Sequence, residues 1–108
     1  DLYRMELAVG ELRAFLGTNP ESPKMLAETT AALEKVLQWQ IQRHLSVADY
    51  YHTLKSPDGE RYHLELATRE QFAGVPGYLE AVDKLQAFES IQAEIDNLSA
   101  TPVGGLQQ

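Results

Sequence analysis

The sequence predicts an α+β fold with a helical majority, made of an αα-hairpin, a β-hairpin and a long C-terminal helix. Three observations lead to this fold class. Helix-period apolar patterns cover residues 2–16 and 22–45. Residues 50–66 instead alternate around a Ser-Pro-Asp-Gly turn. A third helical pattern then runs from about residue 78 to residue 99. A period of 3.6 favours helices and a period of two favours strands.

The first two helical segments are predicted to form the αα-hairpin. Gly17 is expected to end the first helix, and Ser22 followed by Pro23 is a typical helix start, with serine as the N-cap. The second helix is expected to run to about Leu45, and two helices joined by so short a loop should pack antiparallel. The first carries an apolar stripe at spacings of three and four, formed by Leu2, Met5, Val9, Leu12 and Leu16.

The central stretch is interpreted as a β-hairpin. Pro57 presets one backbone angle of the turn and Gly59 provides a permissive position. Pairing across a four-residue loop places His52 opposite His63, on the wetter face of the ribbon. The other face carries Tyr51, Thr53, Tyr62, Leu64 and Leu66. Such asymmetry is typical of a half-buried antiparallel ribbon.

An alternative is an all-α bundle of four or five helices. Ser46 and Asp49 have the spacing of a capping box, which would start a short helix at Val47. A further helix would then extend from Pro57 to Ala73. Both interpretations of the central stretch remain open from the sequence.

The last part of the domain is predicted to be one long helix, from about Tyr78 to Ser99. A short helical turn near residues 68–73 and the breaker Gly74-Val75-Pro76-Gly77 precede it. The apolar residues of the long helix recur mostly at spacings of three, so the stripe drifts around its surface. Residues 1–99 are expected to form one compact domain, followed by a flexible tail over residues 100–108.

The long helices exceed the first helix in length by roughly 10 Å, at about 1.5 Å per residue. Either the hairpin or a second copy of the chain should cover this excess. We therefore expect a candidate interface at the end of the last helix, formed by Phe88, Ile91, Ile95 and Leu98. Aromatic residues are enriched in interfaces, although they also occur at the margins of small cores. They add three candidates: Trp39, Tyr50 and Tyr51.

Charge and composition disfavour several classes of function. The net charge is −7, and residues 76–108 hold five acids against one base, so no basic patch for nucleic acid is expected. No apolar run approaches the length of a membrane span. Cysteine is absent, which removes thiol chemistry and agrees with a cytoplasmic location. No phosphate-binding loop, dinucleotide fingerprint, nucleophile elbow or zinc-protease motif is present.

Two polar pairs are candidate sites. His52 and His63, with Glu65 nearby, would share a face of the predicted hairpin and could hold a metal ion or respond to pH. Gln40 and His44 lie four residues apart on an apolar helix face and could line a ligand pocket. The structural alternative is that these are solvated or core-edge side chains.

The function expected from these features is a non-enzymatic interaction or assembly module without a cofactor. It would form a homodimer through its C-terminal helix and bind a protein partner as an adaptor, chaperone or assembly factor does. The alternatives are a ligand-binding regulatory or sensor domain at Gln40 and His44, and a small metal protein or enzyme at the histidine pair.

Overall fold

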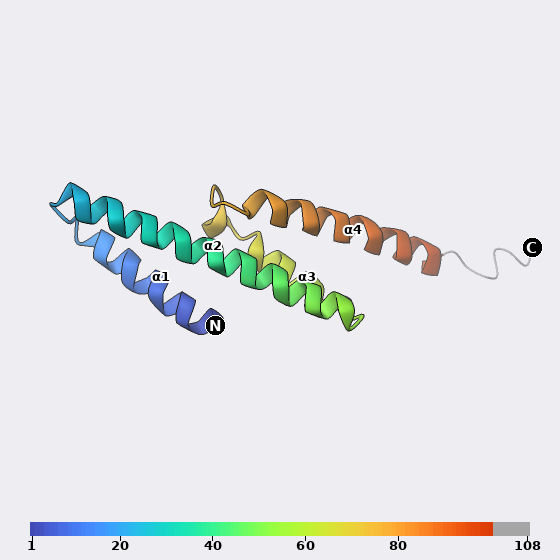
Figure 1. Cartoon of the computed structure of the whole chain (residues 1–108). Helices are drawn as coiled ribbons and strands as arrows, with labels where there is room; N and C mark the ends of the chain where they lie inside the picture. The colour runs from blue at the N-terminus through green and yellow to red at the C-terminus, as the bar shows by residue number, and fades with distance from the viewer. Residues whose placement is uncertain (101–108) are drawn as a thin grey trace, which may run out of the picture.

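The computed structural model describes residues 1–100, and within this range the chain is all-helical (Figure 1). The α-helices are α1 (Leu2–Gly17), α2 (Pro23–Thr53), α3 (Pro57–Ala67) and α4 (Tyr78–Ala100), with a 3₁₀ turn, η1, at Glu70–Phe72. The predicted α+β class is therefore wrong, since the described residues contain no strand. The helical class that stood as its alternative is the one found.

The first helix and the start of the second agree with the sequence prediction. The Asp1 carboxylate caps α1 by accepting hydrogen bonds from the backbone N–H groups of Tyr3 and Arg4. The Ser22 hydroxyl caps α2 by accepting from the N–H of Met25. The reversal between the helices uses Asn19, whose φ is 54°, rather than Gly17.

The predicted β-hairpin is replaced by the end of α2, a tight turn and α3. Helix α2 continues eight residues past Leu45, and Ser46 lies inside it. The reversal is a Schellman motif, in which the N–H of Ser56 donates to the carbonyl of Tyr51 and the N–H of Lys55 to that of His52. Lys55 takes the left-handed conformation, with a φ of 57°.

The residues that predicted a turn instead begin α3. Ser56 precedes the helix, Pro57 takes its first position, and Asp58 and Glu60 lie in its first turn. Proline is well suited to this position because its missing N–H would have no helical partner. Carboxylates are favourable there because they face the positive end of the helix dipole.

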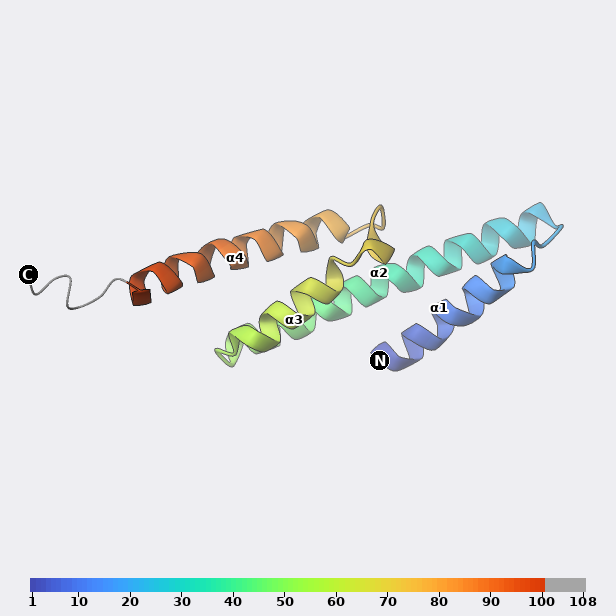
Figure 2. The same ribbon diagram turned by 180° about the vertical axis from the view of Figure 1, so that it is seen from behind.

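The four helices form an elongated arrangement with one central core. Figures 1 and 2 show α1 beside the first part of α2, α3 beside the later part of α2, and α4 running past the α2–α3 turn. The core lies where the helices overlap, and its buried apolar residues are Val9, Leu37, Ile41, Leu45, Ala48, Leu64, Ala67, Phe72, Ala81 and Phe88. Before Leu37, α2 has no buried residue.

The last helix agrees with its predicted range to within one residue. Gly74 and Gly77, with φ values of 82° and 96°, separate η1 from α4. Of the predicted tail over residues 100–108, Ala100 is the last residue of α4. The rest of the predicted tail lies outside the described residues.

Packing of α2 on α3 depends on the glycine that the hairpin interpretation placed in a turn. A Cβ atom at Gly59 would lie 2.6 Å from two ring atoms of Tyr51, so the two helices approach closely at this point. We expect Gly59→Ala to lower the free energy of unfolding by about 1–3 kcal/mol, because either the Tyr51 ring or helix α3 must shift to make room for the methyl group. Urea denaturation measures the change.

Gly10 provides the matched control. It is exposed within α1, and a Cβ atom there would meet nothing within 4 Å. Gly10→Ala should therefore stabilise the protein by about 0.5–1 kcal/mol through helix propensity alone. If Gly59→Ala stabilised the protein as Gly10→Ala does, the close contact between α2 and α3 would be disproved.

Candidate functional site

The interface of α2 and α3 brings two histidines together. The Nδ1 atoms of His44 and His63 lie 3.1 Å apart, within hydrogen-bonding distance. A neutral imidazole carries one N–H, so one of these rings donates from Nδ1 and the other accepts there. The donating ring then has a bare Nε2 and the accepting ring an Nε2–H.

Aromatic side chains enclose the pair. The Tyr51 ring stacks on His63 with 5.8 Å between centroids, and Tyr62 meets His63 edge-on. Phe72 from η1 meets His44 edge-on at 6.4 Å. His44 is 8% exposed, and these contacts join α2, α3 and η1 around the imidazoles.

Both histidines are held in the neutral form. Burial, with smaller contributions from the neighbouring His63 and Arg69, lowers the pKa of His44 from 6.5 to about 4. Burial also lowers the pKa of His63, with a contribution from Arg43. The arginines act because a positive charge nearby disfavours a second cation. Near neutral pH the pair is therefore uncharged.

A cavity of about 230 Å³ opens beside the pair. We call it the histidine cavity. The amide oxygen Oε1 of Gln40 is buried and has no hydrogen-bond partner among the described residues. The lining comes from α1, α2, α3 and the segment around η1: Leu2, Glu6, Gln40, His44, Tyr62, His63, Leu66, Arg69, Gln71 and Phe72.

The structure brings the two residues of the predicted ligand pair together, but not the two residues of the predicted metal pair. Gln40 and His44 are both buried and both line the histidine cavity. His52 and His63 do not form the expected pair, because His52 Nδ1 lies 3.2 Å from Glu60 Oε1 and His63 contacts His44. The proposed pairing depended on the strand register, which does not exist. Among residues 1–100, no group of three or more His, Asp or Glu side chains could hold a metal ion.

The predicted interface residues of α4 divide into two groups. Phe88 is buried, with the Arg61 guanidinium 5.3 Å from its ring centre, so it belongs to the core and not to an open seam. The other three face solvent, and we call them the α4 stripe: Ile91, Ile95 and Leu98, which are 56%, 46% and 76% exposed.

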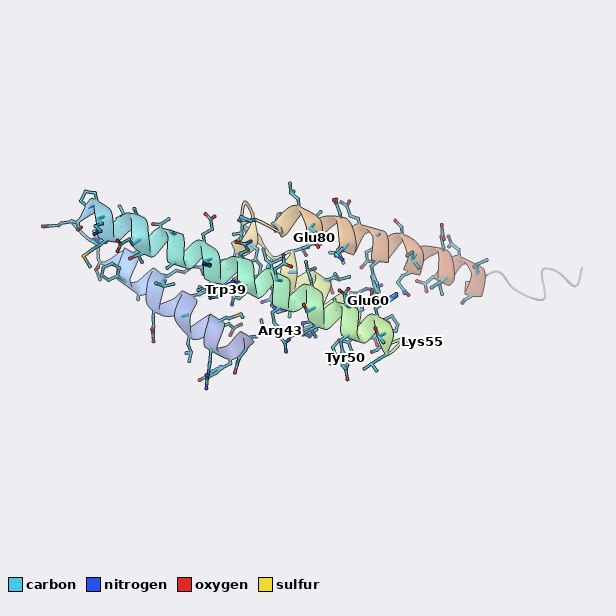
Figure 3. The ribbon with its side chains drawn as sticks, viewed as in Figure 1. Trp39, Arg43, Tyr50, Lys55, Glu60 and Glu80 are labelled. Carbon is cyan, nitrogen blue, oxygen red and sulfur yellow. The ribbon has the colours of Figure 1, made fainter. Side chains whose placement is uncertain are left out.

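The predicted aromatic residues do not form one patch. Trp39 and Tyr50 are both exposed but lie about 16 Å apart along α2, at 1.5 Å per residue (Figure 3). The Lys35 ammonium lies 5.8 Å from the centre of the Trp39 ring. Tyr51 packs inward on His63 and joins the core margin.

Two adjoining hollows separate the α4 stripe from the α2–α3 turn. One has a volume of about 260 Å³ and reaches the core at Leu64 and Phe88, and the other has about 600 Å³ and reaches Ile95. His52, Glu60, Ile91 and Gln92 line both. Together they form a groove along α4.

The contact between His44 and His63 was missed by sequence reasoning. Their separation of nineteen residues has no fixed meaning until the turn at Lys55 is known. The available signal was the i, i+4 spacing of Gln40 and His44 on an apolar face. Once α3 is placed as a helix against that face, His63 is a polar residue available to meet His44.

Comparison with models of protein families, with known proteins and with solved structures found no match for the chain. Within the described residues, none of the helices combines the length and apolarity that crossing a membrane requires. The site therefore has to be interpreted from its own geometry.

Stability should depend on pH through the histidine pair. The unfolded chain protonates His44 near pH 6.5, whereas the folded chain does so only near pH 4. Between these values the unfolded state binds more protons than the folded state. The contribution of His44 to the free energy of unfolding is therefore complete above pH 6.5 and is lost as the pH falls toward 4. We expect a loss of about 2 kcal/mol, allowing for solvent screening, in urea titrations across this range.

Two substitutions locate this dependence. His44→Leu should flatten the slope below pH 6.5, because no buried imidazole then needs to be neutral. His52→Gln changes an exposed histidine of the same helix and should leave the slope in place. An unchanged slope in His44→Leu would contradict the assignment.

Proposed function

We propose that the chain is a non-enzymatic assembly module that forms a homodimer through the end of α4. The observation that carries this proposal is the α4 stripe, three large aliphatic side chains exposed on one side of a well-formed helix. An unpartnered apolar stripe on a helix is a typical feature of an association surface.

The stripe is open because α3 is too short to cover α4. Helix α3 has 11 residues and α4 has 23, or roughly 16 and 34 Å at 1.5 Å per residue. Buried contacts of α4 therefore end at Phe88. Beyond that residue α4 runs past the α2–α3 turn, as Figure 2 shows.

The stripe continues the core-facing side of α4 beyond the residues that the other helices cover. Ala81 and Phe88 face the core. At about 100° per residue, Ile91, Ile95 and Leu98 lie about 60°, 20° and 80° round the helix from Phe88, all in the same direction. The apolar side that packs on the core in the first half of α4 is therefore continued at its end, where it is open to solvent.

A second copy is the occupant that the residues around the stripe favour. Ala87 and Lys84 share the stripe at about 100° per residue, while Glu89 and Asp96 lie on the other side of the helix. An antiparallel pair with its twofold axis near Ile91 would place Ile95 opposite the small Ala87. The Lys84 ammonium would lie beside the last turn of the other α4, where a cation is favourable.

This arrangement joins apolar surface to apolar surface and keeps Glu89 and Asp96 in solvent. Glu89 is already paired within the chain, with its Oε1 atom 3.2 Å from the Nε atom of Arg61. The net charge of −7 is compatible with binding of a basic protein partner elsewhere, as an adaptor, a chaperone or a structural assembly factor would do. We propose the cytoplasm as location, since the cysteine-free chain needs no oxidising compartment.

Light scattering behind size exclusion tests the dimer. The chain has a mass of 12.1 kDa, so we expect twice that value, stable to a tenfold dilution. The double variant Ile91→Glu, Ile95→Glu should run as a monomer, because it places four carboxylates in the interface. The neutral double variant Ile91→Gln, Ile95→Gln should also dissociate, which attributes the effect to lost apolar burial and not to charge alone.

Leu79→Glu is the matched control. Leu79 lies on the same helix and is 75% exposed, almost the same as Leu98, but it is far from the stripe. It should leave the dimer intact. A wild-type chain that is monomeric at every concentration would sink the proposal, and so would a dimer that survives both double variants.

A further inference from the structure

The Gln40 side chain is the most unusual polar group of the described chain. It is 3% exposed, yet its Oε1 atom accepts no hydrogen bond. Leaving a buried acceptor unpaired costs about 1–3 kcal/mol, and such groups are rare in native proteins. Because Gln40 lines the histidine cavity, rotation of its amide group turns Oε1 towards the cavity, where a bound molecule can supply the missing donor.

The cavity carries a defined set of further polar groups. Since the two Nδ1 atoms bind each other, His44 and His63 have only their Nε2 atoms left for a ligand, one as donor and one as acceptor. Arg69 and Gln71 add a guanidinium and an amide, and Glu6 of α1 adds a carboxylate. The groups come from several elements, so the site exists only in the folded chain.

The electrostatic environment favours an anion despite the acidity of the chain. Arg69 is the one cation among the lining residues, and it contributes to the lowered pKa of His44. Arg43 likewise contributes to the lowered pKa of His63. Each arginine thus adds a positive contribution to the potential at one of the imidazoles, and a bound negative charge would offset it.

The volume and the apolar lining of the histidine cavity limit which molecules can bind there. The volume of about 230 Å³ is below the range of roughly 300–1,000 Å³ that accommodates drug-sized molecules. Leu2, Leu66 and Phe72 provide apolar surface beside the polar groups. The occupant is therefore a small molecule with a short apolar part.

We propose that the histidine cavity binds a small organic acid that carries an α-hydroxyl or α-amino group. Its carboxylate pairs with Arg69, and its O–H or N–H donates to Gln40 Oε1. An imidazole Nε2–H is placed to donate to the same acid, and Glu6 suits the ammonium of an amino acid. This site is separate from the α4 stripe and would add ligand binding to an assembly module.

A matched set of three-carbon probes tests the two recognition elements separately. L-lactate and L-alanine have both the carboxylate and the donor, propionate lacks the donor, and lactamide lacks the charge. Titrations are followed by the imidazole NMR signals of His44 and His63. We expect lactate or alanine to bind at least about tenfold more tightly than propionate and lactamide, equivalent to 1.4 kcal/mol.

Two variants connect binding to the named groups. Gln40→Leu should weaken binding at least about tenfold and yet leave the empty protein as stable as the wild type or more so, because it removes the unpaired acceptor. Arg69→Gln should weaken binding of the acids to the level of lactamide. Arg13→Gln, an exposed arginine of α1, is the matched control and should bind as the wild type does.

Binding of a suitable acid should also raise the pKa of His44, because an anion beside it stabilises the imidazolium. The inference is overturned if none of the probes shifts the imidazole signals, which would mean that only water occupies the cavity. It is equally overturned if all four bind alike or if Gln40→Leu retains full affinity. Repeating the titration on the Ile91→Glu, Ile95→Glu variant separates this result from the outcome for the dimer.

Discussion

The contact between the second half of α2 and α3 is the constraint on which the rest of the structure depends. Lys55 in the left-handed conformation turns the chain back, and Gly59 lets α3 approach the Tyr51 ring. Only then do the buried side chains Leu45 and Ala48 of α2 have a partner surface. This close approach of α3 to α2 determines where the histidine pair, the cavity beside it and helix α4 lie.

A part-buried pair of imidazoles within this contact contributes more to specificity than to stability. Apolar side chains tolerate sliding between two helices, whereas the Nδ1 atoms of His44 and His63 meet at only one register. Keeping both rings neutral lowers stability in acid, but near neutral pH the bond fixes α3 on α2. Gln40, one turn away, shows that polar groups at this point are not fully satisfied by the chain itself.

Sequence reasoning found the elements whose ends carry local signals. Asp1 and Ser22 cap their helices by side-chain hydrogen bonds, and the glycines at 74 and 77 break the chain as expected. It failed at residues 46–66, where tyrosine and threonine favour strands and the turn uses a lysine in a conformation that usually calls for glycine. Packing of α2 on α3 overrides these preferences, and packing of this kind has no local signature.

The candidate sites also divide into residues with a local sequence signal and residues that come together only through packing. Gln40 and His44 were predictable because helical spacing places them on one face, whereas His63 joins them only after the turn is known. Helix α3 then separates two surfaces despite its 11 residues. Tyr62, His63 and Leu66 line the histidine cavity, while Glu60 and Leu64 line the groove below α4. One short helix therefore has the proposed ligand site on one side and the groove beside the α4 stripe on the other, so that substitutions can be made in either without touching the other.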